Sequence, residues 1–269
     1  MLSHYMYCMS PLSLRPLEAG ERGDISNPSK SETDLRSTKQ TLALIHGYDY
    51  LLYRSPRYSD RGANWAKVQL TLETLRAGYE WVVFIDSDAQ FTNPGVPLEW
   101  LFNRWNLTHD TAFSIAEEPD LDRDRDRFGK RGLNTGFYVA RNEPRTHALL
   151  RAWAECPSRY PGCEEWRSRP LMEQTAFSEY VRYDGAFAGM IAVVPCNEAN
   201  GYPDAVGETG CSGAFVRHTW LAKGQTKDWF AHAVMQAIVP QLHRLFVMDM
   251  ERVVVDWRDK TLKGSEMLG

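Results

Sequence analysis

Apolar and polar positions in the first half of the chain form blocks that predict alternating helices and strands. Residues 31–46 and 64–77 place their apolar side chains near one face of a helix, and a Gly follows each segment as a stop signal. Residues 5–9, 48–53 and 81–85 are short apolar runs of the strand type. The last of these, WVVFI, has no polar position, as expected of a central parallel strand. The alternation predicts an α/β protein with a mostly parallel, Rossmann-like central sheet flanked by helices.

The second half of the chain continues with mixed elements. The predicted strands are 111–116, 136–140 and 190–194, and the predicted helices are 147–155, 171–182 and 228–248. Pro170 is expected in the first turn of its helix, and Pro240 is a point where the last helix could be interrupted.

Two polar segments read as loops. Residues 11–30 are rich in Pro, Gly, Ser and charged residues. Residues 120–132, DLDRDRDRFGKRG, read as a solvated, flexible loop. The alternative for the second segment is a mobile flap over a substrate, because it precedes a strand of the predicted site.

Composition is compatible with a single catalytic domain over residues 1–269. The chain has 269 residues, of which 43% are apolar, so it can bury a sizeable core. Residues 1–30 would supply a short first strand and a loop, and residues 228–269 a helical region at the C-terminus. A net charge of −4 argues against a nucleic-acid partner, which requires a concentrated basic face. No apolar run is long enough to span a membrane, and the first residues lack the pattern of a signal peptide.

The five cysteines leave two interpretations open. Cys156 and Cys163 bracket one short loop, Cys196 and Cys211 bracket another, and Cys8 is left over. Two local disulfides would fit an oxidising lumen, whereas five free thiols would fit the cytosol. A glycosylation sequon begins at residue 106.

Two aspartates, Asp86 and Asp88, follow the apolar strand at 81–85 with one residue between them. In an open α/β sheet, ligands bind beyond the carboxyl ends of the strands. Two neighbouring carboxylates repel each other, and a divalent cation removes that repulsion. Mg²⁺ or Mn²⁺ prefers such oxygen ligands and often shares them with substrate phosphates, so the pair predicts a metal that holds a diphosphate. The alternative is a helix cap or a solvated turn.

A third metal ligand and a phosphate-binding cation are available in the segment FVRHTWLAKG. His218 could complete the coordination sphere through a neutral imidazole nitrogen, and Lys223 could hold the diphosphate as a point charge. The alternative for His218 alone is a half-buried histidine with an ordinary hydrogen-bond partner.

These motifs, in this order, resemble the metal-dependent glycosyltransferases of the GT-A fold, and glycosyltransferase family 34 in particular. The segments that carry the resemblance run from about His46 to Lys223 and are HGYDYLLYR, NWAKVQLTL, FIDSDAQFTN, RGLNTGFYVARN, MEQTAF and RHTWLAKG. The resemblance implies retaining transfer of a hexose or pentose from a UDP- or GDP-sugar to a glycan acceptor, with Mn²⁺ or Mg²⁺ as cofactor. Front-face attack is favoured over a covalent intermediate, because Gln174 is an amide and a poor nucleophile.

The resemblance also implies a role for individual residues. The metal ligands would be Asp86, Asp88 and His218; the donor-binding residues Lys67, Ser87, Asn134, Thr135, Gly136 and Lys223; and the residues at the reacting carbon Gln174 and Glu173. Glu173 would take acceptor hydroxyls, and the absence of a side chain at Gly136 would let the backbone approach the donor sugar.

Rival functions are a nucleotidyltransferase and a non-catalytic sugar- or nucleotide-binding protein of the same fold. The chain lacks the early Gly-rich, basic loop expected of the first, and its intact set of metal ligands with Lys223 argues against the second. The family, the cysteine pairs and the sequon favour the Golgi lumen, with the cytoplasm as the alternative. A homodimer is a further option for the partner.

Overall fold

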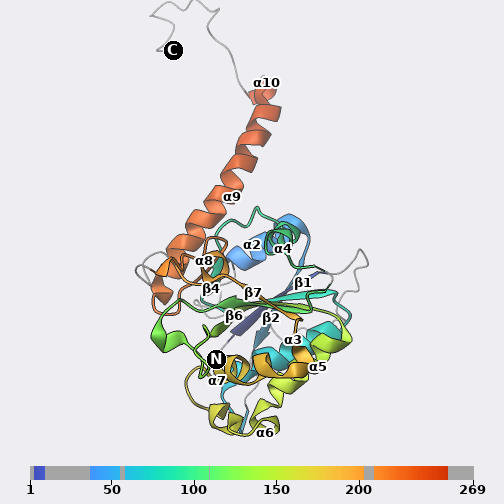
Figure 1. Cartoon of the computed structure of the whole chain (residues 1–269). Coiled ribbons are helices and arrows are strands. Elements are labelled where there is room, and N and C mark those ends of the chain that lie inside the picture. Colours follow the sequence, from blue (N-terminus) through green and yellow to red (C-terminus); the bar gives the residue numbers. More distant parts are fainter. Residues whose placement is uncertain (1–2, 10–36, 55–57, 109, 203–208, 254–269) are drawn as a thin grey trace, which may run out of the picture.

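The computed structural model describes residues 3–9, 37–54, 58–108, 110–202 and 209–253. A six-stranded sheet forms its centre, in the order β2-β1-β3-β6-β5-β7 (Figure 1). The strands are β1 (Ser3–Met9), β2 (Asp49–Arg54), β3 (Trp81–Ile85), β5 (Phe113–Glu117), β6 (Leu133–Arg141) and β7 (Ile191–Val194). A second, two-stranded sheet pairs β4 (Ala89–Phe91) with β8 (Val216–His218).

Strand direction confirms the expected fold class and corrects one detail. Strands β2, β3, β5 and β7 run in one direction, whereas β1 and β6 run in the opposite direction between them. Parallel pairing was therefore the wrong expectation for β3, because both of its neighbours are antiparallel to it. The carboxyl ends of β3 and β5 and the amino end of β6 still meet at one edge of the sheet, and this edge carries the site.

Helices cover both faces of the sheet. They are α2 (Ser37–His46), α3 (Ala66–Arg76), α4 (Leu98–Arg104), α5 (Pro144–Ala154), α6 (Cys156–Arg159), α7 (Met172–Glu179), α8 (Cys196–Ala199), α9 (Thr226–Met248) and α10 (Met250–Val253). Side chains of α3, α5 and α7 fill the core on one face, and side chains of α2, α4 and α8 fill the core on the other. Because side chains alternate along β3, Val82 and Phe84 enter the first core and Val83 and Ile85 the second.

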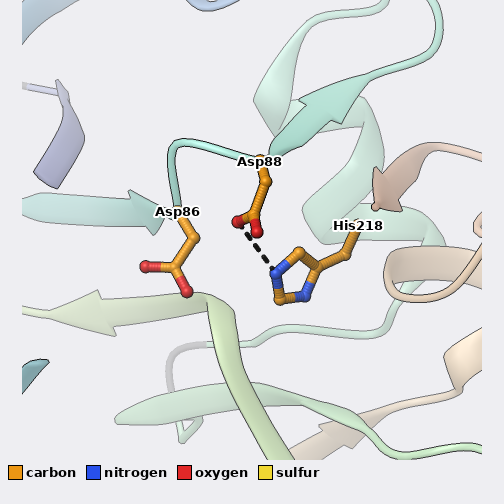
Figure 2. A group of neighbouring side chains, drawn as sticks. All are labelled: Asp86, Asp88 and His218. Carbon is orange, nitrogen blue, oxygen red and sulfur yellow. Dashed lines mark hydrogen bonds and ion pairs between the residues drawn. The ribbon is translucent and has the colours of Figure 1, made fainter. Parts of the chain in front are cut away.

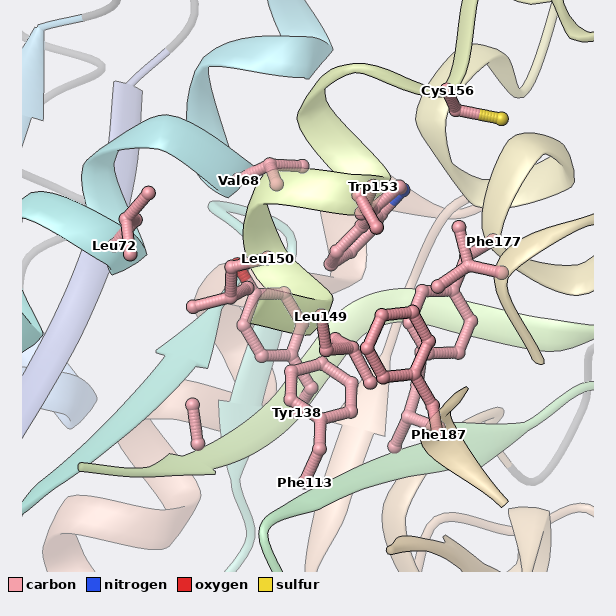
Figure 3. Packing of buried hydrophobic residues seen from close by; sticks show 14 of the residues in the cluster. Val68, Leu72, Phe113, Tyr138, Leu149, Leu150, Trp153, Cys156, Phe177 and Phe187 are labelled. Atoms are coloured by element: carbon pink, nitrogen blue, oxygen red, sulfur yellow. The ribbon is translucent and has the colours of Figure 1, made fainter. Parts of the chain in front are cut away.

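Aromatic packing in the first core fixes the position of α7, which carries two predicted catalytic residues (Figure 3). The rings of Trp153 on α5 and Phe177 on α7 lie 4.8 Å apart in an edge-on arrangement. The indole nitrogen of Trp153 also donates a hydrogen bond of 2.7 Å to the backbone carbonyl of Glu173. The core therefore holds the first turn of α7 against the sheet at the site.

The structure corrects both ends of one predicted helix and decides an open point within another. Helix α7 starts at Met172, and its N-cap Leu171 has a left-handed backbone with φ 67°, so Pro170 lies outside the first turn. The same helix ends at Glu179, because Tyr180 leaves helical geometry with φ −127°. Helix α9 continues without a break through Pro240 and extends away from the body of the molecule (Figure 1).

The remaining predicted helices and strands are confirmed within a few residues at their ends. The predicted loop at 11–30 and the start of the helix at 31–46 lie outside the described residues. Among the described helices, none combines the length and apolar character needed to cross a bilayer.

Most of the loop at 120–132 is exposed, as the sequence predicts, whereas Asp126 near its centre is buried. Its two arms form an antiparallel bridge between Arg125 and Arg131. Asp126 at its tip is only 7% exposed and accepts hydrogen bonds from the backbone nitrogens of Phe128 and Lys130. The carboxylate of Asp126 also pairs with Arg182 at 3.3 Å, and this ion pair ties the loop to the rest of the fold.

Both local cysteine pairs are disulfides. Cys156 is bonded to Cys163, and Cys196 is bonded to Cys211, with Cα–Cα distances of 5.8 and 5.0 Å. These distances fall within the usual range for a disulfide. Asn106 of the sequon lies at the surface, with a left-handed backbone of φ 52°.

Candidate active site

Asp86 and Asp88 lie on a tight turn that connects the two sheets. The turn begins where β3 ends, and the backbone nitrogen of Asp86 still donates to the carbonyl of Gly136 on β6 at 2.8 Å. The backbone nitrogen of Ala89 closes the turn on the carbonyl of Asp86 at 3.1 Å, and β4 follows. In the register of β4 and β8, Ala89 is opposite His218, which brings the histidine to the aspartates.

The three predicted metal ligands converge (Figure 2). One ligand atom from each of Asp86, Asp88 and His218 can be chosen so that all lie within 4.8 Å of one another. Asp88 is 8% exposed and His218 is 6% exposed, and Nε2 of the ring lies 3.2 Å from a carboxylate oxygen of Asp88. Two carboxylates and one imidazole form a ligand set that suits a divalent cation such as Mn²⁺ or Mg²⁺.

Two buried asparagines orient the histidine. Nδ1 of His218 lies 3.1 Å from Oδ1 of Asn134 and 3.2 Å from Oδ1 of Asn200. The amide nitrogens of the two asparagines are used elsewhere, on the carboxylate of Glu118 and the backbone carbonyl of Glu117. Since Nδ1 faces two acceptor oxygens, it donates a hydrogen bond there, and this fixes the ring with Nε2 toward the aspartates.

Gly136 makes room for this histidine. A Cβ at position 136 would lie 2.2 Å from Cε1 and 2.5 Å from Nδ1 of His218. The sequence-based reason for this glycine, close approach of the backbone to the donor sugar, therefore needs correction: the neighbour that requires the missing side chain is the imidazole ring.

Lys67 lies beneath the aspartate turn and is 2% exposed. Its Nζ is 3.0 Å from a carboxylate oxygen of Asp86, 3.1 Å from Glu173 and 3.3 Å from the backbone carbonyl of Thr135. Burial alone would lower the pKa of Lys67, but the two carboxylates outweigh burial and raise it. Lys67 therefore stays charged and holds Asp86 and Glu173 together.

Lys223 reaches the same turn from the solvent side. Its Nζ lies 2.9 Å from Asp88, although the side chain is 69% exposed. Burial alone would raise the pKa of Asp88, but hydrogen bonds and charges from His218 and Lys223 outweigh it and hold that pKa well below its usual range. Asp88 is therefore an anion, as a metal ligand must be.

Lys39 on α2 is a residue of the site that the sequence analysis missed. It is 1% exposed, and its Nζ donates to the backbone carbonyl of Asp86. Burial lowers the pKa of Lys39 to about 7, and the nearby aspartates oppose this shift. The available signal was a lysine on the same helix face as the buried Leu42 and Ala43.

Gln174 and Glu173 lie opposite the metal ligands at the start of α7. The side-chain oxygen of Gln174 accepts a hydrogen bond of 3.1 Å from the backbone nitrogen of Thr135, and its amide donates one of 2.6 Å to Glu118. Glu173 is 2% exposed and accepts from the hydroxyl of Thr135 at 3.0 Å. Its second carboxylate oxygen has no hydrogen-bond partner within the described part of the chain.

Glu118 is another residue of the site that the sequence analysis missed, as it missed Asn200 and Lys39. It follows β5 directly, at the same edge of the sheet as Asp86, and accepts hydrogen bonds from the amides of Asn134 and Gln174. Burial raises its pKa above the ordinary value of a carboxyl group. The available signal was an acidic residue directly after a buried strand, as for Asp86 itself.

Most of these side chains surround one cavity of about 520 Å³, whereas Lys39 and Asn200 lie behind its lining. Its lining contains the metal ligands Asp86, Asp88 and His218, together with Lys67, Ser87, Asn134, Thr135, Glu173, Gln174 and Lys223. Every predicted site residue therefore lies at the cavity except Gly136, which does not line it but leaves space for the His218 ring. A volume of this size suits a drug-sized or nucleotide-sized ligand.

Comparison with known proteins agrees with this fold. A solved glycosyltransferase involved in glycosylation of the major capsid of PBCV-1 has a similar fold, with a TM-score of 0.52 at 17% identity over 76% of this chain and 95% of that one. An uncharacterized protein of Arabidopsis thaliana is 31% identical over 101 residues, which are 38% of this chain and only 26% of the plant protein. The family model described as nucleotide-diphospho-sugar transferase matches residues 54–237. This chain therefore belongs to the nucleotide-diphospho-sugar transferase family, with the glycosyltransferase fold expected from its motifs.

Proposed function

We propose that this protein is a metal-dependent, retaining glycosyltransferase that moves a hexose or pentose from a UDP- or GDP-sugar to a glycan acceptor, as in family 34. The observation that carries the proposal is the convergence of Asp86, Asp88 and His218 at the strand edge of the cavity. Bound there, Mn²⁺ or Mg²⁺ would neutralise charge on the diphosphate as the nucleoside diphosphate departs.

Three groups of residues at the cavity would bind the donor. Lys223 is exposed enough to turn from Asp88 to the diphosphate. Ser87 lies between the two aspartates on the cavity wall, where its backbone can meet the phosphates. Asn134 and Thr135 also line the cavity and would contact the donor sugar.

Gln174 and Glu173 divide the work near the reacting carbon. The acceptor oxygen bonds to the anomeric carbon as the bond to the diphosphate breaks, and the departing phosphate takes the acceptor's proton. Gln174 would stabilise the positive charge that develops on the sugar through its side-chain oxygen. Burial and the ion pair to Lys67 leave Glu173 little access to acceptor hydroxyls, so we assign it the positioning of Lys67.

Calorimetry tests the metal and the donor together. UDP should bind more tightly with Mn²⁺ than without it, and Asp88→Asn should abolish that difference. Asp110→Asn, which changes an exposed aspartate outside the cavity, is the matched control. Equal affinity for UDP with and without Mn²⁺ in the unmodified protein would exclude the proposed metal role.

Slow hydrolysis of a nucleotide sugar, measured over a panel of UDP- and GDP-sugars, tests the reaction class and names the donor. A nucleotidyltransferase or a non-catalytic binding protein would release no free sugar from any member of the panel. Release that depends on Mn²⁺ and is lost in Asp88→Asn is the expected result.

Location and assembly are proposed on separate grounds. The two disulfides and the exposed sequon at Asn106 support the Golgi lumen. Five reactive thiols in denatured, unreduced native protein would contradict this location. Exposed apolar side chains on α9, such as Leu242 and Leu245, support a homodimer, which light scattering would detect.

A further inference from the structure

A second cavity of about 380 Å³ adjoins the first. The two cavities share Glu118, Leu171 and Gln174 in their linings. The hydrogen bond of 2.6 Å between Gln174 and Glu118 spans this junction. A ligand in the second cavity therefore reaches the residues of the proposed reacting centre without entering the metal site.

Leu171 stands at the junction in an unusual backbone conformation. Its φ of 67° is left-handed, which a leucine rarely adopts, and its side chain is 60% exposed despite being apolar. Both features are costly, and such strained positions cluster at ligand sites. Leu171 thus offers an apolar edge to ligands on either side.

The charged side chains of the second cavity compensate one another. Apart from Glu118, each has an oppositely charged group within 4.0 Å, in the pairs Arg123–Asp124, Arg125–Asp120, Arg169–Glu165, Asp126–Arg182 and Glu179–Arg127. A surface of paired charges offers many hydrogen bonds but little net field. Such a surface suits hydroxyl groups better than phosphates or carboxylates.

Trp166 adds an apolar surface to this lining. Its side chain is half-buried, and the guanidinium of Arg169 lies 5.6 Å from the centre of its ring. The C–H groups on one face of a sugar ring pack well on an aromatic ring, while hydroxyls at its rim bond to polar neighbours. Paired charges around a tryptophan therefore favour an uncharged carbohydrate.

Glu118 is the exception among these charges. Its partners within the described part of the chain are the neutral amides of Asn134 and Gln174. A buried carboxylate without a cation gains most from an additional hydroxyl donor. An attacking sugar hydroxyl at the junction would supply that donor.

We propose that the second cavity is the acceptor subsite, that it binds a neutral sugar chain over Trp166, and that Glu118 accepts a hydrogen bond from the attacking hydroxyl until the proton of that hydroxyl passes to the departing phosphate. This proposal rests on the proposed function, because it assumes a donor at the metal site. It assigns Trp166 and Arg169 to acceptor binding and Glu118 to orientation of the nucleophile.

The experiment separates donor from acceptor. Hydrolysis of the best nucleotide sugar gives the KM of the donor, and transfer to a panel of neutral, uronic-acid and phosphorylated oligosaccharides gives the KM of the acceptor. The variants are Trp166→Ala, Trp166→Phe and Arg169→Ala, and the matched control is Trp100→Ala, an exposed tryptophan outside both cavities. Circular dichroism checks that each variant is folded.

Neutral oligosaccharides should be the acceptors. Trp166→Ala should raise the acceptor KM about tenfold and the donor KM less than twofold. Trp166→Phe should recover most of this loss, Arg169→Ala should raise the acceptor KM as well, and Trp100→Ala should change neither constant. The subsite proposal would be overturned by transfer only to charged acceptors or to no acceptor. It would also be overturned if Trp166→Ala and Arg169→Ala left the acceptor KM unchanged, or raised the acceptor KM and the donor KM equally. If the unmodified protein hydrolyses no nucleotide sugar, the proposed function itself fails and the subsite fails with it.

Discussion

Replacing Lys67 with methionine should be among the most destabilising substitutions at the site. The Lys67 side chain is 3% exposed and its partner Glu173 is 2% exposed, so the substitution leaves a buried carboxylate without a cation. Removing one member of a buried ion pair typically costs about 3–5 kcal/mol. Asp86, the other partner, is 24% exposed and keeps some water, so we expect about 4 kcal/mol in total.

Urea unfolding of the metal-free protein measures this loss as a change in the free energy of unfolding. Lys67→Met combined with Glu173→Gln should recover at least half of it, because the uncompensated charge is then removed. Arg76→Met is the control on the same helix: Arg76 pairs with Glu73 at 45% and 51% exposure, and its loss should cost under about 1 kcal/mol. A cost below about 1 kcal/mol for Lys67→Met, or no recovery in the double variant, would refute the buried ion pair.

Three further predictions follow from single contacts. Gly136→Ala should push the His218 ring aside and weaken Mn²⁺ binding by roughly 10–100-fold in calorimetry, with the far-UV spectrum unchanged. Burial raises the pKa of Glu118, so its ionised form destabilises the fold once the pH exceeds the ordinary carboxyl range. The free energy of unfolding of Glu118→Gln should therefore rise relative to that of the unmodified protein as the pH increases from about 4 to about 7. Below about pH 4 this advantage should disappear. The disulfide Cys196–Cys211 joins residues 15 positions apart in the sequence. Mutating both of its cysteines should lower the free energy of unfolding, measured in urea, by about 3 kcal/mol.

Hydrophobic pattern predicted the elements of the sheet but not their directions. An apolar run such as residues 81–85 is equally suitable for a parallel or an antiparallel partner when both faces are buried. Direction depends on how distant segments pair, and here β1 and β6 enter between strands that run the other way. Periodicity also identified the last helix but could not decide whether it continues through Pro240.

The candidate site was predicted where its chemistry is local in the sequence. Asp86 and Asp88 follow a buried strand, and that position favours a ligand site, whereas Lys67, Glu173 and Gln174 were assigned through the family resemblance. Asn200 and Lys39 were missed because each acts only through tertiary contact, one on the His218 ring and the other on a backbone carbonyl. Neither contact leaves a spacing in the sequence that a motif could capture.

The three lysines around the aspartate turn differ in their freedom to move, and this difference leads to a last prediction. Lys39 and Lys67 are 1% and 2% exposed, so packing fixes them against Asp86. Lys223 is 69% exposed, and its ammonium pairs with the carboxylate of Asp88, which a metal would also need as a ligand. The ammonium and a bound cation would therefore compete for Asp88 until a diphosphate arrives to accept the lysine.

Lys223→Ala should accordingly have opposite effects on two binding constants. Without the competing ammonium, Mn²⁺ alone should bind Asp88 more tightly, by a factor of a few, as expected for a contact at a largely exposed lysine. UDP in the presence of saturating Mn²⁺ should bind about tenfold more weakly, because a charged hydrogen bond to the diphosphate is lost. Calorimetry measures both constants on the same preparation, and Lys130→Ala, which changes an exposed lysine outside the cavity, is the matched control. If both affinities fall together, Lys223 supports the metal site directly and does not exchange Asp88 for the diphosphate.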